Sequence, residues 1–366
     1  MFHNHASAHI IKMPPKVWRP RPPSRYIPLD YGDKIDDDMF IFRQYGKALA
    51  HKPYGKQVPE QDDIILWDSS LHQAEFDAVI TLPDHIPGDI KAELTSIIQD
   101  NWDCFIAEGV YRPVLGFEFR IDTGGATPVC CKTPNYGIHE GPIMQRSIDT
   151  LLGNNCVRRC GGPWGCKGIL AGKPHQEEVW NIDDYIWRFC VNYRPLNAVT
   201  LPFAFPIPRC DNSMDDFGDA DGRCELISVD GKSGFNQIGV AIEDQEKLAF
   251  FAPDGHKYCY KVMPFGPNNG PAVYTAMTRT MQDEWDQLFT ERKPDDTTRA
   301  GTKTIIDDTL LFCKTMKLCC LYFRCICETY KKYRLSFNPK KCDFFKKRTE
   351  WLGRGLKSEG NNPNSI

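Results

Sequence analysis

The sequence has no apolar segment long enough to cross a membrane, and residues 1–5 are polar and histidine-rich, without the apolar core of a secretory signal. We therefore expect neither membrane association nor secretion, which leaves an intracellular location, cytoplasmic or nuclear. An excess of positive charge is also lacking, because 45 Lys and Arg residues stand against 48 Asp and Glu residues, for a formal net charge of −3. The 366 residues do have a hydrophobic fraction of 41%, which predicts a globular protein with one large or two moderate cores.

Disulfide pairing is not expected, although the chain has 16 cysteines, because no secretory signal directs it to an oxidising compartment. The spacing of Cys156, Cys160 and Cys166 differs from that of paired zinc ligands, and a fourth ligand is not evident. Four further cysteines lie within residues 316–330, in a pattern typical of an amphipathic helix that uses cysteine as a small apolar residue. We therefore predict reduced cysteines that pack in the core.

The order of local patterns along the chain predicts an α+β fold. Residues 13–23 are rich in proline and residues 33–38 are acidic, so residues 1–85 are expected to form a linker-like, partly disordered segment. Helical patterns occur at residues 90–99, 142–152, 271–289 and 316–333. Strand patterns occur around Ile169, Phe189, Val229, residues 247–251, Ile305 and Leu311.

Two adjacent acids separate apolar segments near the end of the chain. Residues 303–312 predict a strand, a tight turn at Asp307 and Asp308, and a second strand. Adjacent carboxylates raise each other's pKa unless a cation lies between them, although an ordinary hairpin turn is the alternative interpretation. Residues 224–230 form another short apolar segment that ends in an acid, Asp230. Three carboxylates at the ends of neighbouring strands can hold two magnesium ions, so the pattern predicts nucleotidyl transfer.

Several motifs, in a fixed order, extend this prediction. They are residues 187–197, Asp230 with 233–235, residues 263–271, 305–308, 338–344 and 351–353. From about Asn101 onward the chain resembles the reverse transcriptases of gypsy-type long-terminal-repeat retrotransposons and, more distantly, those of retroviruses. The resemblance implies a right-hand polymerase with fingers and palm, a βαββαβ-type palm sheet backed by helices, and an absent or truncated thumb. Residues 86–366 would form this core, with fingers mainly in 140–225 and palm mainly in 226–366.

The resemblance also implies roles for single residues. Asp230, Asp307 and Asp308 would be the catalytic carboxylates and would hold two Mg²⁺ ions, with Mn²⁺ as the alternative metal and with Asp230 and Asp307 as the firmest ligands. Lys341 would protonate the leaving pyrophosphate, and a solvated surface lysine is the alternative interpretation of this residue. The chain would thus be an RNA-directed DNA polymerase core, a fragment of a larger polyprotein.

Further residues are implied to bind the substrates. Lys173 and Arg188 would contact the triphosphate, Phe235 would exclude a ribose 2′-hydroxyl, and Phe265 and Gly266 would complete the nucleotide site. Trp351, Leu352 and Gly353 would hold the primer end. Several of these residues also have a purely structural interpretation. Phe235 and Trp351 would be core aromatics, and Gly266 would be a turn residue. Arg188, with Arg194, would form the polar face of a strand.

The implied partners are an RNA or DNA template with a DNA primer, deoxynucleoside triphosphates and the rest of a retrotransposon polyprotein. Since the net charge is negative, binding of phosphates must rely on a local group of basic residues. We name this group the basic stripe; it consists of Lys331, Lys332, Arg334, Lys340, Lys341, Lys346, Lys347 and Arg348.

Two positions depart from the family pattern. Ile305 stands where the family has tyrosine, and Asn192 stands where it usually has aspartate. An inactive relic, or a recruited nucleic-acid-binding module with the same fold, is therefore the alternative function. Residues 122–124 also match the Asp-Thr-Gly signature of a retroviral-type aspartic protease, but the fingers-like residues 163–165 follow too soon for the strands that such a protease needs.

Overall fold

The computed structural model describes residues 41–44, 47–50, 80–105, 113–172, 187–207, 224–294, 300–351 and 354–357. The chain divides into two units, residues 1–50 and 51–366. In the first, β1 (Ile41–Gln44) and β2 (Lys47–Ala50) form an antiparallel hairpin. This hairpin lies within the predicted linker, residues 1–85, most of which is outside the described residues; the linker stays a prediction.

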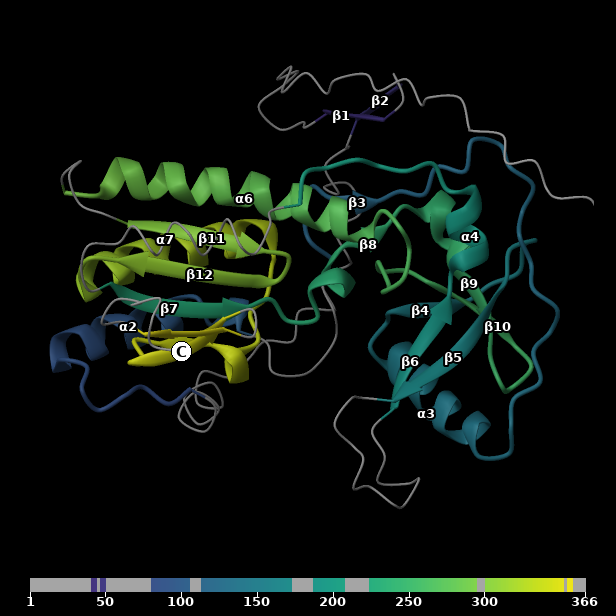
Figure 1. Cartoon of the computed structure of the whole chain (residues 1–366), viewed down its shortest axis with the longest axis horizontal. Coiled ribbons are helices and arrows are strands. Elements are labelled where there is room, and N and C mark those ends of the chain that lie inside the picture. The colour runs from purple at the N-terminus through teal and green to yellow at the C-terminus, as the bar shows by residue number, and fades with distance from the viewer. Residues whose placement is uncertain are drawn as a thin grey trace, which may run out of the picture. The chain divides into compact units, whose positions relative to one another are not determined.

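The second unit contains a five-stranded sheet, in the order β4-β10-β9-β5-β6 (Figure 1). Only β5 and β9 run parallel; the other neighbours are antiparallel. Its strands are β4 (Val157–Arg159), β5 (Cys166–Gly172), β6 (Trp187–Asn192), β9 (Ala249–Phe251) and β10 (Lys257–Tyr260). Helix α3 (Glu140–Gly153) packs against it. Strands β9 and β10 thus join the fingers strands, although they follow residue 225 in the sequence.

A four-stranded antiparallel sheet in the order β11-β12-β7-β13 forms the other half of this unit. The strands are β7 (Glu225–Asp230), β11 (Ala300–Ile305), β12 (Asp308–Cys313) and β13 (Asp343–Phe344). Helix α6 (Gly270–Arg292) lies between β7 and β11 in the chain, and α7 (Met316–Tyr333) lies between β12 and β13. The order is therefore βαββαβ, and the predicted α+β palm is confirmed.

The two faces of the palm sheet differ in what they contact. Directly paired residues on antiparallel strands share a face, so Asp230 and Asp308 lie on one side together with Leu310. On the other side, Ile227 and Leu311 belong to the main core, which α6 and α7 also line. Helix α2 (Gly88–Asp100) packs in turn against α7. The helices therefore cover one face of the sheet (Figure 1). By the strand register, Asp230 and Asp308 lie on the opposite face.

Helix α7 begins at a capping threonine and buries cysteines. The Thr315 hydroxyl accepts a hydrogen bond from the Leu318 amide at 3.3 Å, and Arg334 ends the helix in a left-handed conformation. Its buried face includes Cys319, Cys320, Cys325 and Cys327, all fully buried. All the cysteines that the structure describes are free thiols, so the predicted packing role of these four is confirmed.

The remaining elements are short. They are β3 (Glu118–Phe119), β8 (Gly239–Val240), α4 (Arg194–Val199), the β14 (Arg348–Trp351) and β15 (Arg354–Lys357) hairpin, and the 3₁₀ turns η2 (Trp102–Cys104), η3 (Gly234–Gln237), η4 (Ile242–Leu248) and η5 (Pro339–Lys341). No helix in the described part of the chain is both long and apolar enough to span a membrane.

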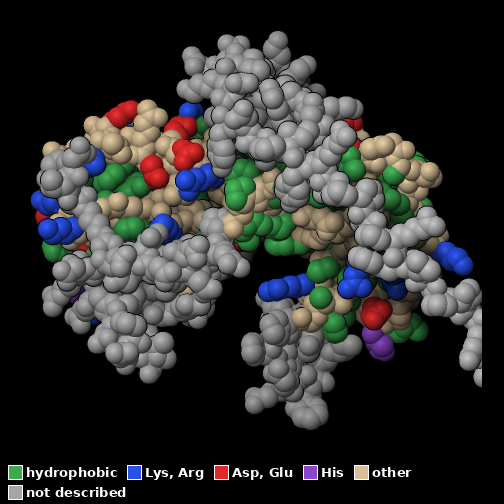
Figure 2. Space-filling model, turned by 45° about the horizontal axis from the view of Figure 1, so that its top comes forward, with side chains coloured by type: hydrophobic (Ala, Val, Ile, Leu, Met, Phe, Trp, Pro, Cys, Tyr) green, Lys and Arg blue, Asp and Glu red, His purple; other side chains and the backbone are tan. Residues whose placement is uncertain are grey.

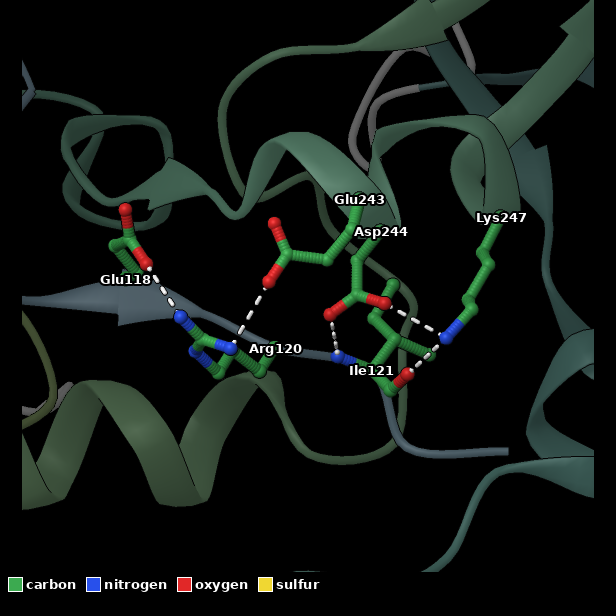
Figure 3. A network of polar contacts seen from close by, with 6 residues as sticks. All are labelled: Glu118, Arg120, Ile121, Glu243, Asp244 and Lys247. Atoms are coloured by element: carbon green, nitrogen blue, oxygen red, sulfur yellow. Dashed lines mark hydrogen bonds and ion pairs between the residues drawn. The ribbon is translucent and has the colours of Figure 1, made fainter. Parts of the chain in front are cut away.

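A polar network joins the segment after β3 to η4 (Figure 3). The buried Asp244 carboxylate accepts hydrogen bonds from the Ile121 amide at 2.9 Å and from the Lys247 amine at 2.7 Å. Lys247 also donates to the Ile121 carbonyl at 2.6 Å, while Arg120 pairs with Glu118 and Glu243. In the Asp-Thr-Gly sequence that follows, the Asp122 carboxylate accepts from the Gly124 amide at 2.8 Å, a turn role that differs from catalysis.

A second polar network lies between α6, α7 and β11. The Asp286 carboxylate accepts hydrogen bonds from the Tyr322 hydroxyl and from the Thr302 hydroxyl, the latter at 3.2 Å. Trp285 donates to the same Thr302 oxygen at 3.1 Å. Burial raises the pKa of Asp286, and the two hydroxyl donors oppose that rise. A partly buried carboxylate thus receives donors from two other elements.

Replacing Tyr322 with phenylalanine should lower the free energy of unfolding by about 2 kcal/mol, because it removes a donor from a partly buried charged acceptor. Urea denaturation monitored by circular dichroism gives the value. Tyr333→Phe is the matched control, since the Tyr333 hydroxyl donates to the partly exposed Glu284 at 2.7 Å and its loss should cost less. Equal losses in the two variants would contradict the role given to the Asp286 network.

Candidate active site

Three acids meet at one end of β7 and β12. Asp230 is the last residue of β7 and is directly paired with Asp308, the first residue of β12. Asp307 lies in the two-residue turn between β11 and β12, and its carbonyl accepts a hydrogen bond from the Gly231 amide at 2.8 Å. The other turn residue, Ile306, has φ 57°, a left-handed conformation that costs a β-branched residue about 1–3 kcal/mol. The predicted strand, turn and strand are confirmed, but the turn lies one residue earlier than predicted, at Ile306 and Asp307, and Asp308 belongs to β12.

Each of these acids makes ionisation of its neighbours less favourable. Burial, followed by the charges of Asp307 and Asp230, raises the pKa of Asp308 to about 6. Burial also raises the pKa of Asp307, with the charge of Asp230 adding to the shift. The Lys341 amine lies 3.0 Å from an Asp230 oxygen. Partial burial lowers the pKa of Lys341, but its hydrogen bond to Asp230 and the three negative charges raise it overall.

Asp308→Asn should stabilise the protein at neutral pH. Because the folded-state pKa of Asp308, about 6, exceeds the ordinary 3.8, the folded state binds the proton more tightly, and wild-type stability falls as the pH rises through this range. Since Asp308 is only partly buried and solvent screens its charge, we expect a gain of about 1–2 kcal/mol at pH 7.5.

Thermal melting with chelator at several pH values measures this gain. The difference between Asp308→Asn and wild type should vanish below about pH 4, where the wild-type carboxyl is protonated in both states. Asp149→Asn is the control, because Asp149 is exposed on α3 and accepts only a surface hydrogen bond from Gln145. A gain that does not depend on pH would contradict the electrostatic explanation.

Aromatic residues flank the acids. Phe235, in η3, is 9% exposed, and its ring centre lies 4.9 Å from that of Phe265 and 5.4 Å from that of Tyr274. Phe265 is 63% exposed and therefore forms the solvent side of this group. Gly266 has φ +111°, and a Cβ at this position would lie 3.3 Å from the Tyr193 ring. A glycine is thus required there, both by conformation and by space.

Comparisons with known proteins agree with this geometry. Residues 184–356 match the family model described as reverse transcriptase (RNA-dependent DNA polymerase). The Drosophila melanogaster retrovirus-related Pol polyprotein from transposon opus is 26% identical over 242 residues, which are 66% of this chain and 22% of that protein. The Schizosaccharomyces pombe transposon Tf2-3 polyprotein is 25% identical over 306 residues, 81% of this chain and 21% of that protein. The chain resembles a retrotransposon reverse transcriptase.

Solved structures support the same fold. A foamy viral protease-reverse transcriptase in complex with an RNA/DNA hybrid aligns with 81% of this chain and 37% of its own, at a TM-score of 0.60 and 15% sequence identity. The resemblance to the reverse transcriptase core of gypsy-type long-terminal-repeat retrotransposon polyproteins is thereby confirmed. The chain spans about a fifth of the length of the curated relatives it matches.

Of the two residues predicted to bind the triphosphate, Arg188 and Lys173, the structure describes only Arg188. Arg188 is exposed on β6, an edge strand, and is paired with Ala171 of β5. Lys173 follows β5 directly and lies outside the described residues. Asn192 ends β6, and its side-chain oxygen accepts a hydrogen bond from the Arg194 amide at 3.3 Å. Arg194 begins α4, so the interpretation of this residue as part of a strand face is wrong.

The segment predicted to hold the primer packs on the face of the palm sheet that bears the acids. Trp351 is 2% exposed and belongs to a cluster with Leu226, Leu310, Phe312 and Ile305. Ile305, which replaces the tyrosine of reverse transcriptases, is therefore a core residue beneath Trp351. Residues 352 and 353 lie outside the described part, and the primer-holding role of Trp351, Leu352 and Gly353 stays a prediction.

Half of the basic stripe, four of its eight residues, is already paired with acids. Lys332 lies 2.8 Å from Glu284, Lys331 lies 3.6 Å from Asp103, Lys341 contacts Asp230, and Lys346 contacts Asp343. Figure 2 shows basic and acidic side chains interspersed on the visible face of the described residues. The charge available for a nucleic-acid backbone is thus smaller than the sequence suggests.

The three acids fit a divalent cation by donor type. Carboxylate oxygens are the ligands that Mg²⁺ prefers, and a cation would relieve the mutual repulsion of these charges. Among the described residues, however, no three His, Cys, Asp or Glu side chains converge closely enough to hold one ion. An ion held by all three acids therefore requires a side chain of the group to turn toward the others.

Sequence reasoning missed one residue of the site, Tyr274 on α6. Its hydroxyl lies beside Gly231 and Gly234, and both of these glycines also lie close to the Asp307 Cβ. Nothing in the helical pattern of residues 271–289 distinguishes Tyr274 from a core aromatic, because the pattern shows which face is buried but not what that face contacts.

Proposed function

We propose that the chain is the catalytic fingers-and-palm part of an RNA-directed DNA polymerase that adds deoxynucleotides to a DNA primer on an RNA or DNA template. The observation that carries the proposal is the pairing of Asp230 with Asp308 beside the Asp307 turn, on the face of the palm sheet opposite the helices. Magnesium, or manganese in its place, would activate the primer hydroxyl and neutralise the developing phosphate charge when bound by these acids.

The chain's own residues would then carry the other tasks. Phe235 would lie beneath the sugar, supported by the rings of Phe265 and Tyr274. Arg188 and Lys173 would bind the triphosphate from the fingers. The Lys341 amine, which is mostly exposed and stays protonated beside Asp230, would give a proton to the departing pyrophosphate.

The setting of this activity is part of the proposal. The curated relatives are polyproteins, so we propose that this chain acts as one segment of a retrotransposon polyprotein, inside the cell. The printed title of the foamy viral structure names a bound RNA/DNA hybrid, and the same kind of duplex is the proposed partner here.

Primer extension tests the proposal. Purified protein, a DNA primer annealed to an RNA template, Mg²⁺ and the four deoxynucleotides should give extended primer, whereas Asp307→Asn should give none. Binding of the hybrid without extension by the folded wild-type chain would instead support the alternative, an inactive relic or a recruited nucleic-acid-binding module. In that case the binding should fall steeply with salt and should not change when the acids are replaced.

A further inference from the structure

The Tyr274 hydroxyl lies near the turn that contains Asp307. Tyr274 is 1% exposed, and a Cβ added to Gly234 would meet its hydroxyl oxygen at 2.7 Å and the Asp307 Cβ at 3.1 Å. A Cβ at Gly231 would meet the same two groups at 3.1 Å and 3.4 Å. The Tyr274 hydroxyl and the Asp307 Cβ thus both lie beside Gly231 and Gly234, at the positions where these glycines lack a side chain.

This hydroxyl is a neutral hydrogen-bond donor. A tyrosine side chain has an ordinary pKa of about 10, so the oxygen keeps its proton at neutral pH and can donate. Within the described part of the chain, no group accepts a hydrogen bond from it. The hydroxyl oxygen is not among the fully buried unpartnered polar atoms of the described residues, so part of it stays accessible and can donate to a group that approaches it.

Asp307 is the residue that can supply the acceptor. As the structure stands, the acids do not converge on one point, so binding an ion to all three requires a movement. Asp307 lies in the two-residue turn, whereas the Asp230 and Asp308 carboxyls hydrogen-bond to each other and Asp230 also contacts the Lys341 amine at 3.0 Å. The Asp307 side chain is therefore the one with freedom to turn, and the Tyr274 hydroxyl lies next to its Cβ.

We propose that Tyr274 is a positioning residue, whose hydroxyl donates a hydrogen bond to the Asp307 carboxylate when this carboxylate turns to hold a divalent cation. The inference rests on the proposed function. The phenol would hold the ionised carboxylate in the metal-binding orientation and leave its second oxygen for the ion. The Tyr274 ring would keep its separate contact with Phe235, so only the hydroxyl serves Asp307.

Tyr274→Phe tests this role because it removes one oxygen and keeps the ring. Mn²⁺ binding followed by electron paramagnetic resonance should be about 10-fold weaker in this variant than in wild type. The melting temperature without metal should stay unchanged, since the hydroxyl has no partner there. In primer extension kcat should fall while KM for deoxynucleotides stays within about 2-fold, because the Phe235 contact is retained.

Two further variants separate a positioning role from a structural one. Tyr322→Phe, which removes another buried palm hydroxyl, should lower the melting temperature and leave Mn²⁺ affinity unchanged. In an Asp307→Asn background, adding Tyr274→Phe should cause no further loss of Mn²⁺ affinity, since the proposed acceptor has lost its charge.

The outcomes distinguish the two proposals. Two results would overturn the role of Tyr274 while leaving polymerase activity in place. The first is a Tyr274→Phe variant that binds Mn²⁺ as tightly as wild type. The second is a loss of Mn²⁺ affinity on Tyr274→Phe that is equally large in the wild-type and Asp307→Asn backgrounds. A folded wild-type chain that neither binds Mn²⁺ nor extends a primer would overturn both the proposed function and this inference.

Discussion

Replacing Asp230 with asparagine should lower the rate of nucleotide incorporation about 1000-fold or more, because charge stabilisation of this kind supplies most of the acceleration in phosphoryl transfer. Asp230 is paired with Asp308 and binds the Lys341 amine at 3.0 Å, so its charge organises two other groups of the site. Asparagine keeps the side-chain shape and removes only the charge. Single-turnover incorporation on a primed RNA template is the measurement.

Asp343→Asn is the matched control for this experiment. Asp343 lies on β13, which flanks β7 on the side away from β12, and it pairs with Lys346 rather than with Lys341. Its loss should change the rate by less than about 2-fold, as expected for a surface ion pair. Melting curves of both variants show whether they fold. A folded Asp230→Asn protein that keeps about a tenth or more of the wild-type rate would exclude a catalytic role for Asp230.

Phe235→Val should reduce the preference for deoxynucleotides over ribonucleotides about 100-fold. The Phe235 ring is held between Phe265 and Tyr274 and is 9% exposed, so it has little freedom to move away from an added hydroxyl. Valine leaves space for that oxygen. The ratio of kcat/KM for a deoxynucleotide and for the matching ribonucleotide, measured on one template position, gives the result.

A variant that lowers stability at a position away from the candidate site shows whether loss of stability alone changes the sugar preference. Phe289→Val removes a buried ring that stacks on Tyr322 at 3.9 Å, far along α6 from the acids. It should lower the melting temperature and leave the sugar preference unchanged. An unchanged preference in Phe235→Val would contradict the proposed position of this ring beneath the sugar.

Much of the palm follows from local patterns. The strands that carry the acids are short apolar runs, of which β7 ends at Asp230 and β12 begins at Asp308. Helix α7 begins and ends at the predicted residues because Thr315 caps it and Arg334 stops it. Helix α6 extends slightly beyond the predicted 271–289, to Gly270–Arg292. The helices satisfy their own backbone groups and β11 pairs with its neighbour β12, so local periodicity is informative for these elements.

The fingers were predicted less completely, because their pairing is set by tertiary contacts. The strand predicted at residues 247–251 starts only at Ala249, since Lys247 belongs to η4, where its amine binds Asp244 and the Ile121 carbonyl. Strands β4 and β10 pair with each other across about 100 residues of sequence, and neither has a strong pattern of its own. Local propensity carries no information on such a pairing.

In the candidate site, too, the residues found from local motifs differ from the contacts that only the folded structure shows. The three acids and Lys341 are found from motifs, and the structure brings Lys341 to Asp230. The partial neutralisation of the basic stripe was not foreseeable, because its acidic partners, such as Glu284 and Asp103, come from distant parts of the chain. Contacts between a helix face and a glycine turn, like that of Tyr274, are likewise visible only after folding.

The cysteines of α7 provide a way to time the opening of the palm. Cys319, Cys320, Cys325 and Cys327 have no exposed surface, so a thiol reagent reaches them only after the helix separates from the sheet. At saturating reagent their labelling rate equals the opening rate, and at low reagent it reports the equilibrium between closed and open forms. Cys130, which is exposed, reacts without any opening and serves as the internal reference.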